Sequence, residues 1–408
     1  MLDLGTAYGR KTGTHDPGLT EVGAGTPMGE LMRRYWLPVG LSSDATDLPK
    51  AVRALGEDLI LFRAGDGRAG LVTPRCIHRG ASLFYGRIES DCIRCPYHGW
   101  KFGIDGTCLD QPCEPGGGTK ANVFRQPWYP VEERYGLIFA YLGPPAKKPL
   151  LPHYDVLEGL SEKEHLFTDD IHLGAGVPIG QENVPFNWLQ HFENIHDPAH
   201  FIWLHYAHSG PQFGARFGEV DAILADPSKW VGEVQFEENA NGVVAKRDCA
   251  LPDGRFLKNR VETLLPCIRG VPNPRGSEGP ADHLGFMLPV DDVNFRIFTV
   301  YRGIGGECEA LSRGFSSTIN QRWADVAADA TVQQRFPNDW ETQSSQGPIT
   351  RHGDEHLVSS DRGIVMLRRL YARQAQIVAD GGDPIGVTFA GDPMRHVEAG
   401  AFVSAAAI

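Results

Sequence analysis

The pattern of apolar and polar positions changes twice along the chain. Near the N-terminus, Thr26-Pro27 predicts the start of a short helix with Thr26 as its N-cap, and the segment 28–36 is amphipathic. From residue 41 to 142, short apolar runs alternate with glycine turns, a pattern typical of strands joined by hairpins. The clearest of these runs are 59–62, 71–73 and 137–142.

A different pattern begins near residue 160, where strands and helices mix. Residues 184–205 are predicted to be mainly helical, and helical periodicity returns at 321–334 and 361–379. The strand-like runs 244–247, 286–289 and 295–300 predict an antiparallel sheet between them. We therefore expect an α+β chain with three parts: an arm and helix at 1–40 that pack on the last part, an all-β domain at 41–150, and a helix-plus-antiparallel-sheet domain at 151–408. Residues 1–20 are expected to be a loose surface arm, and the proline-rich stretch 144–152 a linker.

The composition is that of a soluble globular protein. The 408 residues are 41% hydrophobic and 22% charged, and we find no apolar run long enough for a membrane-spanning helix. The N-terminal stretch lacks the apolar core of a secretory signal, and eight cysteines without a disulfide pattern suggest reduced thiols, so a cytoplasmic protein is expected. The net charge of −12 argues against nucleic acid as a partner.

Two short motifs carry the first candidate chemistry. Cys76-x-His78 is followed, after sixteen residues, by Cys95-x-x-His98. Two cysteines and two histidines can hold either a structural zinc ion or a [2Fe–2S] cluster in which each iron takes a pair of like ligands. Zinc fingers usually place both cysteines in one loop, whereas here each loop carries one of each, which favours the cluster. A zinc site and unrelated core cysteines remain the alternatives.

A second candidate metal site lies in the predicted helix 184–205. Asp197, His200 and His205 form the pattern Asp-x-x-His-x₄-His. Two histidines with a distant carboxylate are the ligands of non-haem Fe(II) oxygenases, and three protein ligands leave positions for O₂. The candidates for a downstream carboxylate are Asp339, Asp354 and Asp361. Three further histidines nearby are expected to be ordinary surface residues: His191, His196 and His208.

Together with the run Tyr97-His98-Gly99-Trp100, these motifs resemble the Rieske-type non-haem iron aromatic oxygenases. The likeness is to their terminal oxygenase (alpha) subunits, in the phthalate-dioxygenase-like group that also holds aryl O-demethylases, and it spans nearly the whole chain. It implies a Rieske [2Fe–2S] domain at 41–150 and a catalytic domain of the helix-grip, START-like type at 151–408.

The resemblance also implies roles for individual residues. Cys76, His78, Cys95 and His98 would hold the cluster. His200 and His205 would bind the mononuclear Fe(II), with Asp339 as third ligand; Asp354, Glu341 and an ordinary helix-start charge are the alternatives for that position. Asp197 would accept a hydrogen bond from a cluster histidine of a neighbouring subunit, unless it only caps its helix, and Asn194 would line the site.

For function, the resemblance implies a component of a multicomponent oxygenase. We find no nucleotide-binding fingerprint, so electrons are expected from a separate ferredoxin, an NAD(P)H-dependent reductase, or both. A homotrimer or a hexamer is expected. The first expectation for the reaction is O-demethylation, a monooxygenation, of a methoxylated aromatic acid, with a lignin-derived vanillate or biaryl substrate. The alternatives are ring cis-dihydroxylation of a phthalate-like acid and an electron carrier without catalysis.

Two sets of basic residues could serve binding. Arginines such as Arg247 and Arg260 could pair with a substrate carboxylate. Five cations near the cluster motifs could either offset the cluster's charge or steer an acidic electron donor. These five are Arg75, Arg79, Arg87, Arg94 and Lys101.

Overall fold

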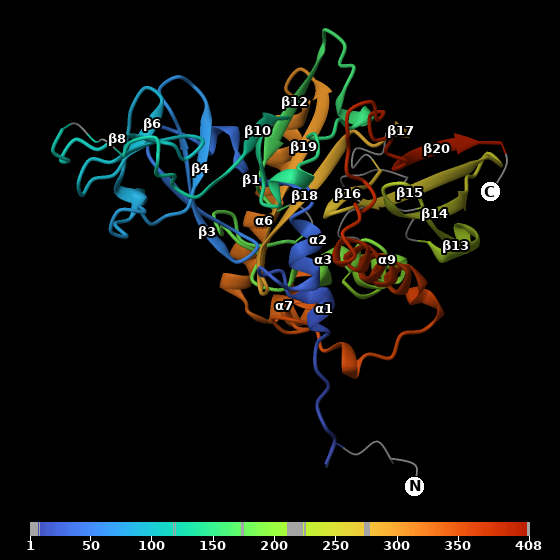
Figure 1. Cartoon of the computed structure of the whole chain (residues 1–408). Coiled ribbons are helices and arrows are strands. Elements are labelled where there is room, and N and C mark those ends of the chain that lie inside the picture. Colours follow the sequence, from blue (N-terminus) through green and yellow to red (C-terminus); the bar gives the residue numbers. More distant parts are fainter. Residues whose placement is uncertain are drawn as a thin grey trace.

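The computed structural model describes residues 7, 9–116, 118, 120–172, 175–209, 223, 226–272 and 278–405. Figure 1 shows a small β-rich unit, coloured blue to cyan, beside a large sheet whose strands run from green to red. This arrangement confirms the predicted α+β fold. No helix within the described ranges has both the length and the apolar character needed to cross a bilayer.

The N-terminal segment packs on the larger unit. Residues 1–6 and 8 of the expected loose arm lie outside the described residues, and its end forms helix α1 (Pro17–Thr20), whose last two residues are buried. Helix α2 (Pro27–Met32) begins where the sequence predicts, because the Thr26 hydroxyl accepts a hydrogen bond from the Gly29 N–H at 3.1 Å. Both helices contact α9 (Arg362–Ala379), and their apolar side chains join one core with it. The expected boundary after residue 40 falls inside strand β1 (Trp36–Leu41).

Three small antiparallel sheets build the β-rich unit. The first has the order β1-β11-β10, with β11 at Leu137–Tyr141 and β10 at Val131–Arg134. The second has the order β2-β3-β4-β9: Lys50–Ala54, Glu57–Arg63, Ala69–Val72 and Trp128–Tyr129. The third has the order β5-β6-β7-β8: Arg87–Ile88, Cys92–Arg94, Lys101–Gly103 and Cys108–Asp110. A separate apolar core, in which Phe62, Ile93 and Phe102 are fully or almost fully buried, joins the second and third sheets beneath the cysteines of the two motifs.

Residues 65–70 have the glycine spacing Gly-x-Gly-x-x-Gly of nucleotide-binding loops, so the expectation that the chain lacks this spacing was wrong. The structure gives these residues a different role, because they close the hairpin between β3 and β4 and no helix follows them. Gly67 has a φ of +89°, which the tight turn requires and which side-chain-bearing residues rarely adopt. The spacing therefore marks a turn and not a phosphate site.

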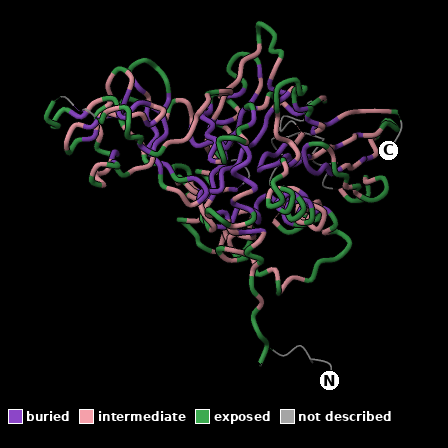
Figure 2. Tube along the Cα trace, viewed as in Figure 1, coloured by how far each residue is buried: buried purple, intermediate pink, exposed green. Residues whose placement is uncertain are grey.

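One large antiparallel sheet forms the centre of the larger unit, and its interior strands account for much of the buried chain in Figure 2. Its main strand order is β12-β19-β18-β16-β15-β14-β13. These strands are Glu164–Asp169, Asn294–Ile304, His283–Asp291, Ile268–Gly270, Phe256–Leu264, Gly242–Ala250 and Trp230–Glu238. The short strands β17 (Gly279–Pro280) and β20 (Gly400–Ser404) pair at the side, next to β15. Helix α6 (Glu307–Ala328) contacts β12 and β19, and α7 (Thr331–Arg335) and α8 (Asp339–Ser344) follow it.

The segment predicted to be mainly helical at 184–205 is made of helical pieces with a break between them. It contains α3 (Trp188–Asn194), a break, α4 (Pro198–Ile202), and then a π-helical turn (Trp203–His208). Pro198 explains the break, because proline disfavours helical backbone at the residue before it, and Asp197 is extended at φ −105° and ψ 91°. The prediction of a mainly helical segment is therefore confirmed, and the break makes Asp197 a helix N-cap.

Candidate metal centres

The two Cys/His motifs form a pair of loops closed in the same way. In each, the cysteine N–H donates to the carbonyl five residues later: Cys76 to Ala81 at 2.9 Å and Cys95 to Trp100 at 2.8 Å. In each, a glycine with positive φ, Gly80 or Gly99, donates its N–H back to the cysteine carbonyl. A Cβ at Gly99 would also come within 2.7 Å of a proline side chain. Glycine is thus needed where each loop turns.

Packing around the loops brings the four predicted ligands together. The rings of His78 and His98 lie 4.6 Å apart between centroids, and His78 stacks on Trp100 at 4.5 Å. Both cysteines are buried, whereas the histidines are partly exposed. The buried Gln126 holds the first loop, since its amide nitrogen donates to the Arg75 carbonyl and its oxygen accepts from the Ile77 N–H at 3.0 Å. No local pattern in the sequence pointed to Gln126.

The electrostatics of the loops suit a bound cation. Burial and the neighbouring Cys95 thiol together raise the pKa of Cys76 to about 12, although backbone N–H groups of the loop oppose part of this shift. Deprotonating the Cys76 thiol in this buried place is costly unless a metal takes the proton's place. The two sulfurs and two imidazoles that the two loops bring together match the donor set of a Rieske [2Fe–2S] cluster.

The second site joins three residues from two distant segments. His200 comes from α4, His205 from the π-helical turn, and Asp339 from the first position of α8. Their candidate ligand atoms all lie within 4.8 Å of one another. His205 Nε2 is 3.4 Å from Asp339 Oδ2, and His200 Nε2 is 3.8 Å from Asp339 Oδ1. Two imidazoles and one carboxylate are the donor set of mononuclear non-haem Fe(II).

The hydrogen bonds in this site fix which atoms face its centre. The Nδ1–H of His200 donates to the backbone carbonyl of Asp197, so Nε2 carries the lone pair that can bind a metal. Burial alone would raise the pKa of Asp339, but His205 and His200 lower it below its usual value. The carboxylate is therefore ionised. Asn194, predicted to line the site, donates its side-chain N–H to Asp339 Oδ1 at 3.0 Å.

The other carboxylates considered for the third ligand are engaged elsewhere. Asp354 Oδ1 accepts the backbone N–H of Gly13 at 2.8 Å, and Asp361 Oδ2 accepts that of Val358 at 2.7 Å. Glu341 belongs to the capping box of α8 and forms an ion pair with Arg322 at 2.7 Å. Among the described residues, Asp339 is the carboxylate that meets the two histidines.

Two of the extra histidines are not surface residues as expected. His191 and His196 are 2% and 0% exposed, and burial lowers the pKa of each to about 3, so both are neutral. His196 Nε2 lies 2.6 Å from the Thr263 hydroxyl on β15, which ties the break before α4 to the sheet. His208 is exposed, as predicted. The two errors have one cause, because the partners of His191 and His196 are far away in sequence.

Asp197 caps α4 through Oδ1, and its Oδ2, called its open oxygen below, accepts no hydrogen bond from the described residues. Its Oδ1 accepts the backbone N–H groups of Ala199 and His200 at 2.9 and 3.2 Å. Its Oδ2 is 3.8 Å from His200 Nδ1, and the side chain is 27% exposed. The structure records no hydrogen bond or ion pair between Asp197 and the described cluster histidines of the same chain.

A row of mostly polar residues crosses the sheet face that is turned toward the helices carrying His200, His205 and Asp339. Five residues on neighbouring strands are in register, so these positions share one face of the sheet. They are Thr263, Arg269, Gly285, Thr299 and Asp169. The Thr263 contact with His196 identifies this face as the inner one. A Cβ at Gly285 would lie 2.5 Å from Arg269 Nε, so the arginine side chain occupies the space over the glycine.

Arg269 is a cation that the sequence did not single out. It is 7% exposed, and although burial lowers the pKa of its guanidinium, the nearby Asp339 opposes that shift. Of the two arginines considered from the sequence, Arg247 stacks on the Trp230 ring at 4.5 Å. Arg260 pairs with Asp248 at 3.2 Å. Arg269 is therefore a buried positive charge in the electrostatic range of the iron-site carboxylate.

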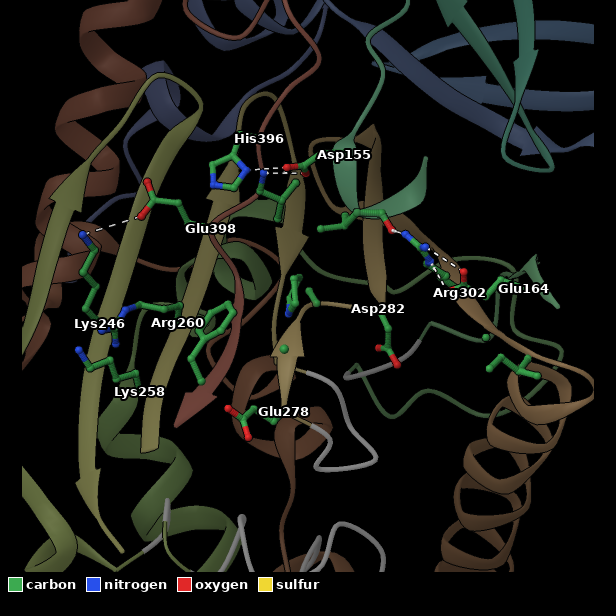
Figure 3. A pocket seen from close by; sticks show the side chains of 18 of the residues that line it. Asp155, Glu164, Lys246, Lys258, Arg260, Glu278, Asp282, Arg302, His396 and Glu398 are labelled. Atoms are coloured by element: carbon green, nitrogen blue, oxygen red, sulfur yellow. Dashed lines mark hydrogen bonds and ion pairs between the residues drawn. The ribbon is translucent and has the colours of Figure 1, made fainter. Parts of the chain in front are cut away.

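A groove of about 920 Å³ opens on the other face of the sheet (Figure 3). Lys246, Lys258 and Arg260 line it from β14 and β15, at positions that alternate with the inner-facing ones. Several of its cations already have acidic partners: Lys246 with Glu237, Arg302 with Glu164, and His396 with Asp155. Because the sheet separates this groove from His200, His205 and Asp339, we do not assign it to the metal site.

Comparison with known proteins gives consistent matches. A family model described as the Rieske [2Fe-2S] domain matches residues 35–127. The chain is 45% identical over 407 residues to the phenoxybenzoate dioxygenase alpha subunit of Ectopseudomonas oleovorans, covering 98% of this chain and 94% of that protein. It is 29% identical over 382 residues to the 5,5'-dehydrodivanillate O-demethylase oxygenase subunit of Sphingobium sp. (strain NBRC 103272 / SYK-6), covering 90% and 81%. The oxygenase in the carbazole-bound oxygenase and ferredoxin complex of carbazole 1,9a-dioxygenase is 21% identical, with a TM-score of 0.57 over 87% of this chain and 95% of that one, and it shares the fold.

The first prediction concerns the cluster loops. Cys95→Ala removes one of the two sulfur donors, so the purified variant is expected to lose the visible absorbance and the electron-spin resonance signal of the cluster. Cys113→Ala, at an exposed cysteine outside the loops, serves as the control and keeps both signals. A Cys95→Ala protein with an unchanged spectrum would refute the cluster assignment.

The second prediction concerns the mononuclear site. Asp339→Ala and His205→Ala are each expected to lose about one iron per chain while the cluster spectrum persists, because the two metal sites share no residue. His208→Ala, at an exposed histidine near the site, should keep its iron. Metal analysis together with the cluster absorbance decides; full iron content in Asp339→Ala would transfer the third ligand to another carboxylate.

Proposed function

Because the chain belongs to the Rieske-type non-haem iron oxygenases as a terminal oxygenase (alpha) subunit, we propose that it oxygenates an aromatic carboxylic acid that carries an aryl ether. As a member of this family it is an oxidoreductase that uses a Rieske [2Fe–2S] cluster and a mononuclear Fe(II). The observation that carries the substrate class is the 45% identity along nearly the whole chain to a phenoxybenzoate dioxygenase subunit.

The residues at the two centres have distinct tasks in this proposal. Cys76, His78, Cys95 and His98 hold the cluster, and His200, His205 and Asp339 hold the Fe(II). When bound, the mononuclear iron supplies the centre at which O₂ is activated, and the cluster supplies the electrons. Three protein ligands would leave coordination positions for O₂. The N-cap at Asp197 keeps His200 oriented.

Arg269 is our candidate for holding the substrate carboxylate. It is a buried cation on the inner face of the sheet, and its charge reaches the iron-site carboxylate Asp339. A guanidinium can bind a carboxylate through two parallel hydrogen bonds, which would orient the ring above the iron site. Phenoxybenzoate and 5,5'-dehydrodivanillate are both aromatic acids with two rings and aryl ether oxygens, so the two named relatives agree with this chemistry.

The type of oxygenation separates two candidate reactions. Dioxygenation is favoured by the relative with 45% identity, whose name states that activity. The O-demethylation predicted from the sequence stays the second candidate, because a relative with 29% identity is an O-demethylase oxygenase subunit. The expectation of a lignin-derived substrate is supported by that second relative and not by the first.

We further propose that the working unit is a ring of chains, as a homotrimer or a pair of stacked trimers. The open Oδ2 of Asp197 would accept a hydrogen bond from His78 or His98 of the neighbouring chain. Apolar side chains are exposed at both ends of this expected contact. At the iron-site helix Trp203 is 68% exposed, and beside the cluster Ile77, Phe84, Tyr85 and Tyr97 are 37–73% exposed.

The electron donor is proposed to be a ferredoxin, as in the carbazole oxygenase and ferredoxin complex, or an NAD(P)H-dependent reductase. The five cations near the cluster contribute unequally to such docking. Arg87, Arg94 and Lys101 form ion pairs with Glu89, Asp110 or Asp91. Arg75 and Arg79 have no acidic partner among the described residues, and Arg79 lies over the exposed Tyr97 ring at 5.7 Å. These two are the cations that would guide an acidic partner to the cluster.

The third prediction tests the reaction. With a reductase, NAD(P)H and isotopically labelled O₂, the protein is expected to place both oxygen atoms of O₂ in the product of phenoxybenzoate. With vanillate, it is expected to release little formaldehyde. Mass spectrometry and a formaldehyde assay measure the two outcomes, with Asp339→Ala as the inactive control. Formaldehyde release from vanillate without turnover of phenoxybenzoate would make O-demethylation the reaction.

The fourth prediction tests Asp197 without disturbing its helix. In Asp197→Asn, the amide oxygen can keep the N-cap hydrogen bonds, so the amide nitrogen replaces the open oxygen and can no longer accept from a histidine N–H. Turnover is expected to fall about 10- to 100-fold or more, as when carboxylates behind metal-bound histidines are lost. Both metals and the reducibility of the cluster should persist. Unchanged turnover in Asp197→Asn would leave Asp197 with its capping role alone.

A further inference from the structure

Helices α3 and α8 are joined by a ladder of buried polar contacts that ends at Asp339. Asn194 and His191, three residues apart on α3, face Asp339 and Gln343, four residues apart on α8. His191 Nδ1 lies 2.9 Å from Gln343 Oε1, and Gln343 Nε2 donates to Asp339 Oδ1 at 3.3 Å. His191 and Gln343 are each 2% exposed. The ladder thus connects the iron-site carboxylate to the protein interior.

The same two helices are also fastened beyond His191. The Gln190 side chain donates to the carbonyls of Gln343 and Gly347, both at 3.1 Å, and accepts the N–H of Thr350 at 3.1 Å. The His191 ring stacks on Phe295 of β19 with 5.4 Å between centroids. His191 is therefore held on two sides, by α8 and by the sheet.

The direction of the hydrogen bonds follows from chemistry. An ionised carboxylate only accepts, so Gln343 must turn its amide nitrogen to Asp339 and its oxygen to His191. The oxygen only accepts as well, so the proton of the neutral His191 ring must be on Nδ1. Each polar group between His191 and Asp339 can therefore act only as a donor or only as an acceptor. The hydrogen bonds run from His191 through Gln343 to Asp339.

We propose that His191 and Gln343 are positioning residues for Asp339. His191 holds the Gln343 amide, and the hydrogen bonds from Gln343 and Asn194 occupy Asp339 Oδ1. Oδ2, 3.4 Å from His205 Nε2, is then the oxygen presented to the metal. This rests on the proposed function, since it takes Asp339 as an iron ligand. Without the donor on His191, the Gln343 amide can rotate, and the carboxylate loses the orientation that suits Fe(II).

The experiment compares two substitutions of one residue and reads iron affinity. His191→Phe keeps an aromatic ring against Phe295 but removes the donor, whereas His191→Asn places an amide N–H near the position of Nδ1. The dissociation constant of Fe(II) at the mononuclear site is expected to rise about 10-fold or more in His191→Phe and to stay within about 3-fold of the original in His191→Asn. Chelator competition measures the constant, and the cluster absorbance reports that the Rieske domain is intact.

Gln343→Met gives a second test at the other link. Methionine has nearly the same length but no amide, so the same rise in the Fe(II) dissociation constant is expected, with a change in the magnetic circular dichroism of the ferrous site. Native iron affinity in His191→Phe or Gln343→Met would overturn the proposal, as would equal losses in His191→Phe and His191→Asn, which would indicate packing. If Asp339→Ala itself keeps its iron, the proposed ligand fails, and that result is distinct from native affinity in the His191 and Gln343 variants.

Discussion

The larger unit is built around one interaction, in which the ionised carboxylate of Asp339 lies beside the imidazoles of His200 and His205. All three side chains are largely buried. An isolated charge in such a place is costly unless hydrogen bonds or a metal compensate it. Asn194 and Gln343 each donate a hydrogen bond to this carboxylate, and the two histidines complete the set of candidate metal ligands. The rest of the larger unit, a sheet with helices packed on it, fixes α3 and α8 so that these groups meet.

Both candidate metal centres expose polar and aromatic side chains at the surface of the chain. The cluster loops end in a partly exposed pair of histidines surrounded by exposed aromatic side chains, and the iron-site helix exposes Trp203 and an open oxygen of Asp197. Each surface offers what the other lacks: N–H donors on one and a carboxylate oxygen on the other. A contact between chains would bury both surfaces, and one hydrogen bond would then join the two centres.

The sequence predicted what depends on short spacing. The candidate ligand pairs Cys76/His78 and His200/His205 and the N-cap at Thr26 each lie close together in sequence, so their patterns were visible without the fold. The break at Asp197 is also a local effect, because Pro198 follows it, although the helical periodicity of the segment gives no sign of it. What the sequence could not predict depends on contacts between residues far apart in the chain, such as the burial of His191 against Gln343 and the position of Arg269 over Gly285.

The most direct test of the account uses two inactive proteins. Chains with Cys95→Ala lack the cluster, and chains with Asp339→Ala lack the mononuclear iron, so neither assembly should turn over alone. Co-expressed and purified as mixed assemblies, they are expected to recover substantial turnover, because an intact cluster in one chain can serve the intact iron site of its neighbour. Mixed assemblies of verified composition that stay inactive would contradict electron transfer between chains.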